Sequence, residues 1–252
     1  CAEMEGKYAR QLELLDGAGQ TLLGLIDDVL DLSRIESGEL EFESIDFDIS
    51  TPDDQVAGKL RTPAGTRGAS LITKHPDALR IQGDPLRLRQ ILLNLVGNAV
   101  KFTEDGEVEV RCEAASSLDD ANVDLTLSVR DTGVGIAADK MKIIFQPFIQ
   151  AEQGTARRFG GSGLGLSIVS RLVGRMGGLV DLDSELDRGT TVTVRLTLPR
   201  SLDQSSQRIS TEAYLLTSPH VLLAEDNPVN QEVVRFMLEQ CNCTVSLAHD
   251  GA

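Results

Sequence analysis

Two pairs of alternating segments constrain the fold of this chain more than any other feature. Apolar and polar residues alternate over 107–113, 123–130, 179–183 and 190–198. A period of two is typical of a strand with one buried face. The polar loop 115–122 joins the first pair, and the turn Asp187-Arg188-Gly189 joins the second, so each pair is predicted to be antiparallel. A sheet of this kind needs helices to cover its apolar face.

Helices with one apolar face are predicted next to these strands. The strongest covers 84–103, with Asp84 as N-cap and Pro85 in the first turn. Its apolar face holds Leu88, Ile91, Leu92, Leu95 and Val96. A second helix is expected over 164–176. Another starts at Thr51-Pro52 and is predicted to be bent or ended by Pro63 and the glycines at 65 and 68. The fold class is therefore α+β: a two-layer α/β sandwich over 45–200, with helices on one face of a mixed, mostly antiparallel sheet.

The segments on either side of this sandwich follow other patterns. One helical apolar seam comprises Leu12, Leu15, Leu22, Ile26 and Val29. Such a seam suits pairing with another helix or packing on the helix's own domain, and periodicity alone leaves both open. The helix is expected to end at Gly38. Residues 201–219 are predicted to be a linker, and 220–252 to open a βαβ unit of another domain.

The composition excludes several classes of protein. With 24 basic and 39 acidic residues, the net charge is −15, the wrong sign for holding nucleic acid through its phosphates. The chain starts without Met inside a predicted helix, which suggests a fragment, and no apolar run is long enough to span a bilayer. The cysteines have no metal-ligand spacing, which fits the reducing cytoplasm. A site for a phosphate-bearing ligand must therefore gather its basic residues locally.

The helix 84–103 carries the first candidate site. Asn94 and Asn98 lie one turn apart on the same side, and Lys101 lies on a neighbouring stripe. Asn is unfavourable inside a helix, so two in one turn need a reason. Both amides could bond neighbouring backbone. Alternatively, Asn98 could give an oxygen to Mg²⁺, which needs few protein ligands when phosphates and water complete its octahedron, and Lys101 could face the phosphates.

Two glycine-containing loops add to this candidate. Asp131-Thr132-Gly133-Val134-Gly135-Ile136 follows a strand, where a carboxylate could accept from an adenine amino group and glycines allow close approach of the backbone. The run 160–165, Gly-Gly-Ser-Gly-Leu-Gly, leads into a helix whose N–H groups could bind a phosphate. A dinucleotide fingerprint would need a strand directly before the glycines, and 153–159 is polar and loop-like instead.

Taken together, these motifs resemble the boxes of the histidine kinase ATP-binding domain. RQILLNLVGNAVKFT (89–103) resembles the N box, DTGVGI (131–136) the G1 box, FQPF (145–148) the F box and GGSGLGLSI (160–168) the G2 box. The resemblance implies ATP and Mg²⁺ as cofactors, with Asn98 as the Mg²⁺ ligand and Asp131 as the adenine reader. The implied nucleotide-binding residues are Asn94, Asn98, Lys101, Phe102, Asp131, Gly133, Gly135, Ile136, Phe145, Arg157, Arg158, Gly161, Ser162, Gly163, Leu164 and Gly165. Of these, Arg157 and Arg158 would be the basic residues of an ATP lid over about 146–162.

The same resemblance extends to both ends of the chain. Residues 1–44 look like the second helix of a dimerisation and phosphotransfer hairpin. Residues 220–252 look like the truncated start of a receiver domain, with Glu225 and Asp226 as an incomplete Mg²⁺ pair. The resemblance implies that the parent is a hybrid histidine kinase that could form a homodimer. Its partners would be a histidine-bearing dimerisation helix and a receiver domain or response regulator. None of the three histidines, His75, His220 and His249, lies in a sequence like that around the family's phosphoacceptor histidine. The fragment should therefore bind ATP without autophosphorylating.

Other ATP-binding proteins share this expected fold. Gyrase-like and chaperone ATPases place a Glu four residues before the magnesium Asn, where this chain has Asn94, and an amide cannot act as a general base. Efficient ATP hydrolysis is therefore not expected, whereas a kinase needs mainly positioning and charge stabilisation. A serine-directed kinase of the anti-sigma type is a more distant alternative. A nucleotide-binding interaction module is the alternative from a different class.

Overall fold

The computed structural model describes residues 19, 22–76, 79–117, 121–149, 162–201 and 219–248. The chain divides into two compact units, Cys1–Gln204 and Ser205–Ala252, each of which we describe by itself. Within the described ranges, no helix has the length and apolar character needed to cross a bilayer.

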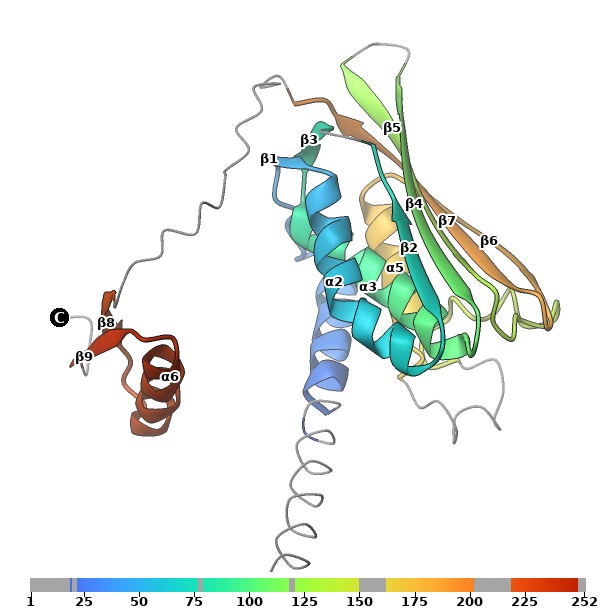
Figure 1. Ribbon diagram of the computed structural model, residues 1–252. Coiled ribbons are helices and arrows are strands. Elements are labelled where there is room, and N and C mark those ends of the chain that lie inside the picture. Colours follow the sequence, from blue (N-terminus) through green and yellow to red (C-terminus); the bar gives the residue numbers. More distant parts are fainter. Residues whose placement is uncertain are drawn as a thin grey trace, which may run out of the picture. The chain divides into compact units, whose positions relative to one another are not determined.

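A five-stranded sheet forms one layer of the first unit (Figure 1). Its order is β2 (Ser70–Lys74), β4 (Glu107–Ser116), β5 (Asn122–Asp131), β7 (Gly189–Pro199) and β6 (Leu179–Glu185). β2 runs parallel to β4 and the other neighbours are antiparallel, which confirms the predicted mixed sheet. The register of β5 and β7 sets Asp131 opposite Thr190. A separate pair, β1 (Ile45–Asp48) and β3 (Arg80–Gly83), was not predicted.

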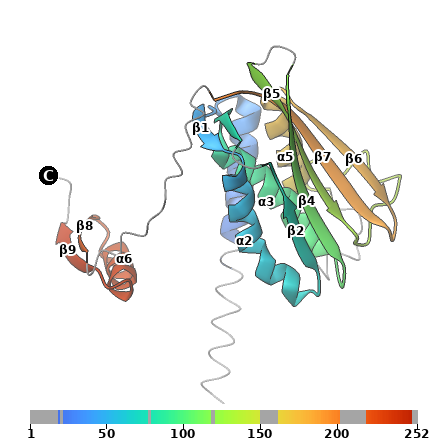
Figure 2. The same cartoon turned by 45° about the horizontal axis from the view of Figure 1, so that its top comes forward.

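Three helices cover one face of this sheet: α2 (Ser50–Thr66), α3 (Pro85–Phe102) and α5 (Gly165–Arg175) (Figure 2). The predicted cap of α3 is confirmed, since Oδ1 of Asp84 accepts from the Arg87 N–H at 3.0 Å. Its predicted apolar face is buried throughout, in the core between helices and sheet: Leu88, Ile91, Leu92, Leu95 and Val96. α2 continues past Pro63 and ends at Thr66, between Gly65 and Gly68, within the segment where the sequence predicted a bend or an end. Gly68, with φ +71°, follows the end of the helix.

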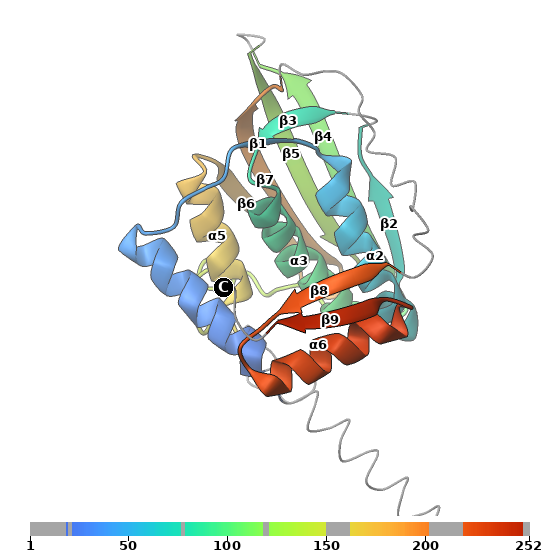
Figure 3. The same cartoon turned by 90° about the vertical axis from the view of Figure 1, so that its left-hand side faces the viewer.

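A further helix over 22–37 precedes the sandwich, and Gly38 ends it with φ +80°, as predicted (Figure 3). Leu32 and Ile35 are buried in the same core as the sandwich helices. In contrast, the seam residues Leu22, Ile26 and Val29 are 46–59% exposed, whereas Leu12 and Leu15 lie outside the described residues. The C-terminal turns of this helix therefore pack on their own domain. The described seam residues, in contrast, are not buried by any described residue of that domain.

The second unit is a βαβ element, as predicted from its pattern. β8 (His220–Ala224) pairs in parallel with β9 (Thr244–Ala248), and α6 (Pro228–Gln240) connects them. Asn227 caps the helix by accepting from the Val229 N–H at 2.9 Å.

Candidate functional site

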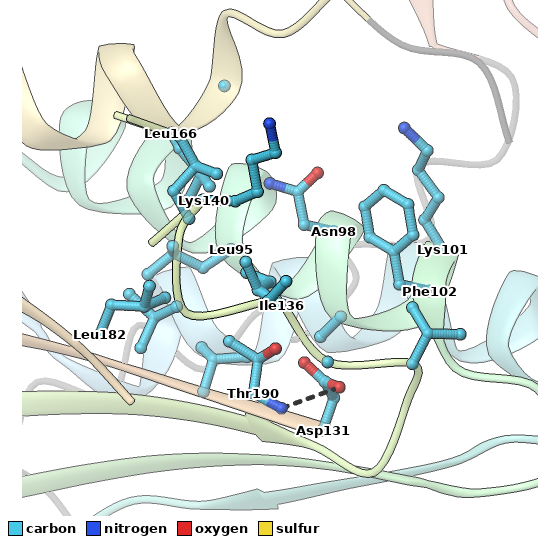
Figure 4. A pocket seen from close by; sticks show the side chains of 18 of the residues that line it. Leu95, Asn98, Lys101, Phe102, Asp131, Ile136, Lys140, Leu166, Leu182 and Thr190 are labelled. Carbon is cyan, nitrogen blue, oxygen red and sulfur yellow. Dashed lines mark hydrogen bonds between the residues drawn. The ribbon is translucent and has the colours of Figure 1, made fainter. Parts of the chain in front are cut away.

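A cavity of about 670 Å³ opens between α3, the loop after β5, the start of α5 and the strands β6 and β7. Figure 4 shows its interior. It is lined by Asn94, Leu95, Asn98, Ala99, Lys101, Phe102, Val129, Asp131, Val134, Gly135, Ile136, Ala137, Asp139, Lys140, Ile144, Ile149, Ser162, Gly163, Gly165, Leu166, Leu182, Leu186, Asp187, Thr190 and Val192. Most of these side chains are apolar, and a few polar groups converge among them, as is typical of a small-molecule site.

Asp131 is the buried carboxylate of this cavity, with 9% of its surface exposed. Its Oδ1 accepts from the backbone N–H of Gly133 at 2.8 Å and of Thr190 at 3.3 Å. Oδ2 accepts no hydrogen bond from the described residues, so it remains available to a ligand. Burial raises the pKa of the carboxyl group, and the two backbone hydrogen bonds act in the opposite direction.

The loop after Asp131 is pressed between α3 and the β6–β7 turn. The Val134 N–H donates to the Phe102 carbonyl at 3.3 Å, and the Asp187 N–H donates to the Val134 carbonyl at 2.8 Å. Gly135 has φ +66°, and a Cβ there would overlap the Glu185 carbonyl. Only glycine therefore allows this loop to reach the turn, which explains the Gly-x-Gly spacing.

Six residues in the second half of α3 line the cavity: the apolar Leu95 and Ala99, together with Asn94, Asn98, Lys101 and Phe102. Asn94 Nδ2 donates to the Gln90 carbonyl at 3.1 Å, so the backbone-bonding alternative holds for this amide. Asn98 has no hydrogen bond to the described residues, and its side chain projects into the cavity (Figure 4). The Lys101 ammonium lies 4.7 Å from the centre of the Phe102 ring. Burial, and then the nearby Arg67, lower the pKa of Lys101.

The second glycine loop enters the cavity beside Asn94. A Cβ on Gly165 would come within 2.7 Å of Asn94 Oδ1, so a larger residue here would displace the Asn94 side chain. Gly163 has φ +70°, and its carbonyl accepts from the Phe148 N–H at 3.1 Å. Ser162 Oγ accepts from the Leu164 N–H at 3.2 Å and donates to Asp28 at 3.1 Å. This last bond links the loop to the helix over 22–37.

The cavity contains ten of the predicted nucleotide-binding residues: Asn94, Asn98, Lys101, Phe102, Asp131, Gly135, Ile136, Ser162, Gly163 and Gly165. Three others do not line it. Gly133 donates its N–H to the Asp131 carboxylate, and Leu164 is fully buried in the core. Phe145 is half-buried, and Ile144 and Ile149 line the cavity instead. The remaining three, Arg157, Arg158 and Gly161, lie outside the described residues.

Several lining residues were not predicted. Thr190, Val192 and Leu182 come from β7 and β6, and the alternation of these strands indicates which of their residues share a face. Which of them meets Asp131 depends on the pairing of β5 with β7, which alternation does not reveal. Lys140 lies on a turn between the motifs at 131–136 and 145–148, and no local sequence pattern predicted that it would line the cavity.

Outside the cavity, the polar groups singled out from the sequence make ordinary contacts. Glu225 Oε1 accepts from the Asn227 N–H at 3.2 Å and from Asn230 Nδ2 at 3.1 Å. Among the described residues, no three His, Cys, Asp or Glu side chains gather as a metal site. His75 lies 3.5 Å from Asp54, and His220 lies 3.0 Å from the Ser246 hydroxyl.

Comparison with known proteins places this cavity in a family. Residues 83–200 match the model described as "Histidine kinase-, DNA gyrase B-, and HSP90-like ATPase". The chain is 35% identical over 249 residues to the autoinducer 2 sensor kinase/phosphatase LuxQ of Vibrio harveyi, covering 96% of this chain and 29% of that protein. It is 39% identical over 191 residues to the signal transduction histidine-protein kinase BarA of Escherichia coli, covering 74% and 20%. The chain thus spans less than a third of the length of these curated relatives.

Solved structures agree with this assignment. Full-length ShkA in complex with AMPPNP superposes with a TM-score of 0.65 at 31% identity, covering 96% of this chain and 49% of that one. The Acinetobacter baumannii histidine kinase AdeS has the same fold, with a TM-score of 0.59 at 21% identity over 74% of this chain and 83% of that one. The chain therefore contains a catalytic, ATP-binding domain of the sensor histidine kinase family.

Proposed function

We propose that this chain is the ATP- and Mg²⁺-binding catalytic part of a hybrid histidine kinase in the cytoplasm. It holds ATP so that the γ-phosphoryl group can pass to a histidine outside these 252 residues. One observation carries the proposal: the cavity has a buried carboxylate at one end and amide and ammonium groups at the other (Figure 4). That polarity matches a ligand with an amino-bearing base and a polyphosphate.

The carboxylate end suits adenine. Because two backbone N–H groups fix Oδ1 of Asp131, its Oδ2 has a set position from which it can accept from the adenine amino group. Ile136 and Leu182 supply apolar surface for the ring in the same cavity. A guanine would present a carbonyl oxygen to the carboxylate and be repelled.

The opposite end suits phosphates and Mg²⁺. The Asn98 amide projects into the cavity with no bond to the described residues, and an amide oxygen is a ligand that Mg²⁺ accepts. Lys101 adds a positive charge, and the backbone at Gly163 and Gly165 leaves room at the start of α5. When bound, Mg²⁺ would neutralise charge on the phosphate oxygens. The chain's own contribution is to orient the phosphates and exclude water from the base end.

Asn94 bears on the choice between kinase and ATPase. Its Nδ2 donates to the Gln90 carbonyl, its Oδ1 faces Gly165, and an amide cannot remove a proton from water. We therefore propose that bound ATP is hydrolysed slowly and kept for transfer.

The flanking segments suggest the partners. The helix over 22–37 would be the second helix of a dimerisation hairpin, in which a histidine-bearing first helix accepts the phosphoryl group and a homodimer forms. The βαβ unit would begin a receiver domain, with Glu225 and Asp226 as part of its Mg²⁺ pair. Neither His75 nor His220 lines the cavity, and His249 lies outside the described residues.

Calorimetry of the chain with ATP and ADP, with and without Mg²⁺, tests the binding proposal. We expect heat with both nucleotides, and tighter ATP binding with Mg²⁺. No heat at millimolar nucleotide would refute the site. Kinase action is tested by supplying the first hairpin helix with its histidine and following acid-labile label from γ-³²P-ATP. If nucleotide binds but no label transfers, a binding module that signals by docking becomes the better description.

A further inference from the structure

The positive charges of the cavity gather at one end. Among the lining residues that the structure describes, the cationic side chains are Lys101 and Lys140. In Figure 4 their ammonium groups lie on either side of the Asn98 amide and point the same way, away from Asp131 and Thr190. Lys101 belongs to the N box, whereas nothing in the proposed function uses Lys140.

The backbone around Lys140 is firmly held. Its N–H donates to the Ala137 carbonyl at 2.9 Å, and its carbonyl accepts from the N–H groups of Ile143 and Ile144 at 2.9 and 3.1 Å. This helical turn fixes the base of the side chain at the edge of the cavity. The backbone of Lys140 is thus held by neighbours that the structure describes.

The ammonium group itself is lightly engaged. The described ion pair of Lys140 is with Asp139, its neighbour in sequence, at 3.9 Å, and the two side chains are 39% and 73% exposed. An exposed pair at this distance contributes little. The Lys140 ammonium can therefore turn to a stronger anion at small cost.

We propose that Lys140 is a second phosphate-binding cation of the nucleotide site, opposite Lys101 across Asn98. The proposal rests on the nucleotide-binding function given above and extends it. In a chain with a net charge of −15, bringing a polyphosphate into a cavity that also holds Asp139 and Asp187 requires local positive charge. A cation from each side of Asn98 would hold the phosphates over the amide, where Mg²⁺ is expected.

The substitution Lys140→Met tests this, because it keeps the length of the side chain and removes the charge. The matched control is Lys142→Met, since Lys142 is exposed and does not line the cavity. Dissociation constants of the 252-residue chain for ATP, ADP and adenosine are measured by calorimetry at low and high salt. We expect Lys140→Met to weaken ATP binding about 2- to 5-fold at low salt, as for the loss of one partly exposed ionic contact. Adenosine binding should not change, Lys140→Arg should restore ATP binding, and Lys142→Met should behave like the unmodified chain.

The outcomes separate this inference from the proposed function. If the unmodified chain binds no nucleotide, the proposed function itself fails. If it binds ATP and Lys140→Met binds ATP equally well, the proposed function stands and the role of Lys140 is refuted. If Lys140→Met weakens ATP and adenosine equally, Lys140 supports the loop structurally, and its phosphate-binding role is again refuted.

Discussion

The substitution Asp131→Asn can separate the two hydrogen-bonding roles of this carboxylate. Oδ1 accepts from the Gly133 and Thr190 N–H groups, so the amide oxygen of Asn will take that place. The Nδ2 group is then forced into the Oδ2 position and faces the base end of the cavity. A ligand amino group would meet a donor where it had met an acceptor, while the loop keeps both of its backbone bonds.

The size of the effect follows from that geometry. A hydrogen bond to a charged group contributes about 1.5–3 kcal/mol, so ATP binding should weaken roughly tenfold to a hundredfold. ITP carries a carbonyl oxygen in place of the amino group, and the new donor should bind it better than the carboxylate did. In Asp131→Ala the loop also loses its two bonds to Oδ1. That variant should therefore lose about 1–2 kcal/mol of unfolding free energy that Asp131→Asn retains.

Calorimetry with ATP and ITP, together with urea unfolding, provides the readouts. Asp124→Asn is a matched control on the same strand, where the carboxylate is exposed and accepts from Thr197 Oγ1 at 2.8 Å, away from the cavity. The expected result is a reversed preference between ATP and ITP in Asp131→Asn and no change in Asp124→Asn. An unchanged ATP-to-ITP ratio in Asp131→Asn would refute the adenine-reading role.

Two further predictions concern stability and packing. Both side-chain oxygens of Asp53 are buried and accept no hydrogen bond from the described residues. Burial raises the pKa of Asp53 to about 6. The folded state therefore takes up this proton at higher pH than the unfolded state. Its stability should fall as the pH rises from about 4 to about 6 and then level off. Asp53→Asn should therefore be about 2–3 kcal/mol more stable than the unmodified chain above that window in urea unfolding, whereas parallel pH curves would contradict this. Asp31 Oδ2 accepts from Gln90 Nε2 at 2.7 Å, and Asp31→Ala removes this acceptor. Backbone hydrogen exchange over 22–37 should then speed up several-fold. Unchanged exchange would show that this contact does not hold the helix on its domain.

The sequence was most informative about single elements. In α3, helical periodicity relates Asn94, Asn98 and Lys101, so their nearby positions on one side followed from spacing, and all three line the cavity. The strands β4, β5, β6 and β7 were likewise predicted from alternation, with ends displaced by a few residues. The loop glycines could be interpreted because a positive φ or close backbone approach leaves few other choices, as Gly135 shows.

Relations between elements were what the sequence left open. Thr190 lies opposite Asp131 because β5 pairs with β7 in one register, and shifting that pairing by two residues would preserve every alternation while giving Asp131 another partner. The same reasoning applies to Lys140, which lines the cavity from a turn whose path the sequence does not reveal. Since the proposed base and phosphate contacts depend on these two relations, the nucleotide preference of the site depends on register and loop path. Substitutions at Lys140 therefore examine a part of the site that its motifs did not predict, whereas substitutions at Asp131 test a residue that they did.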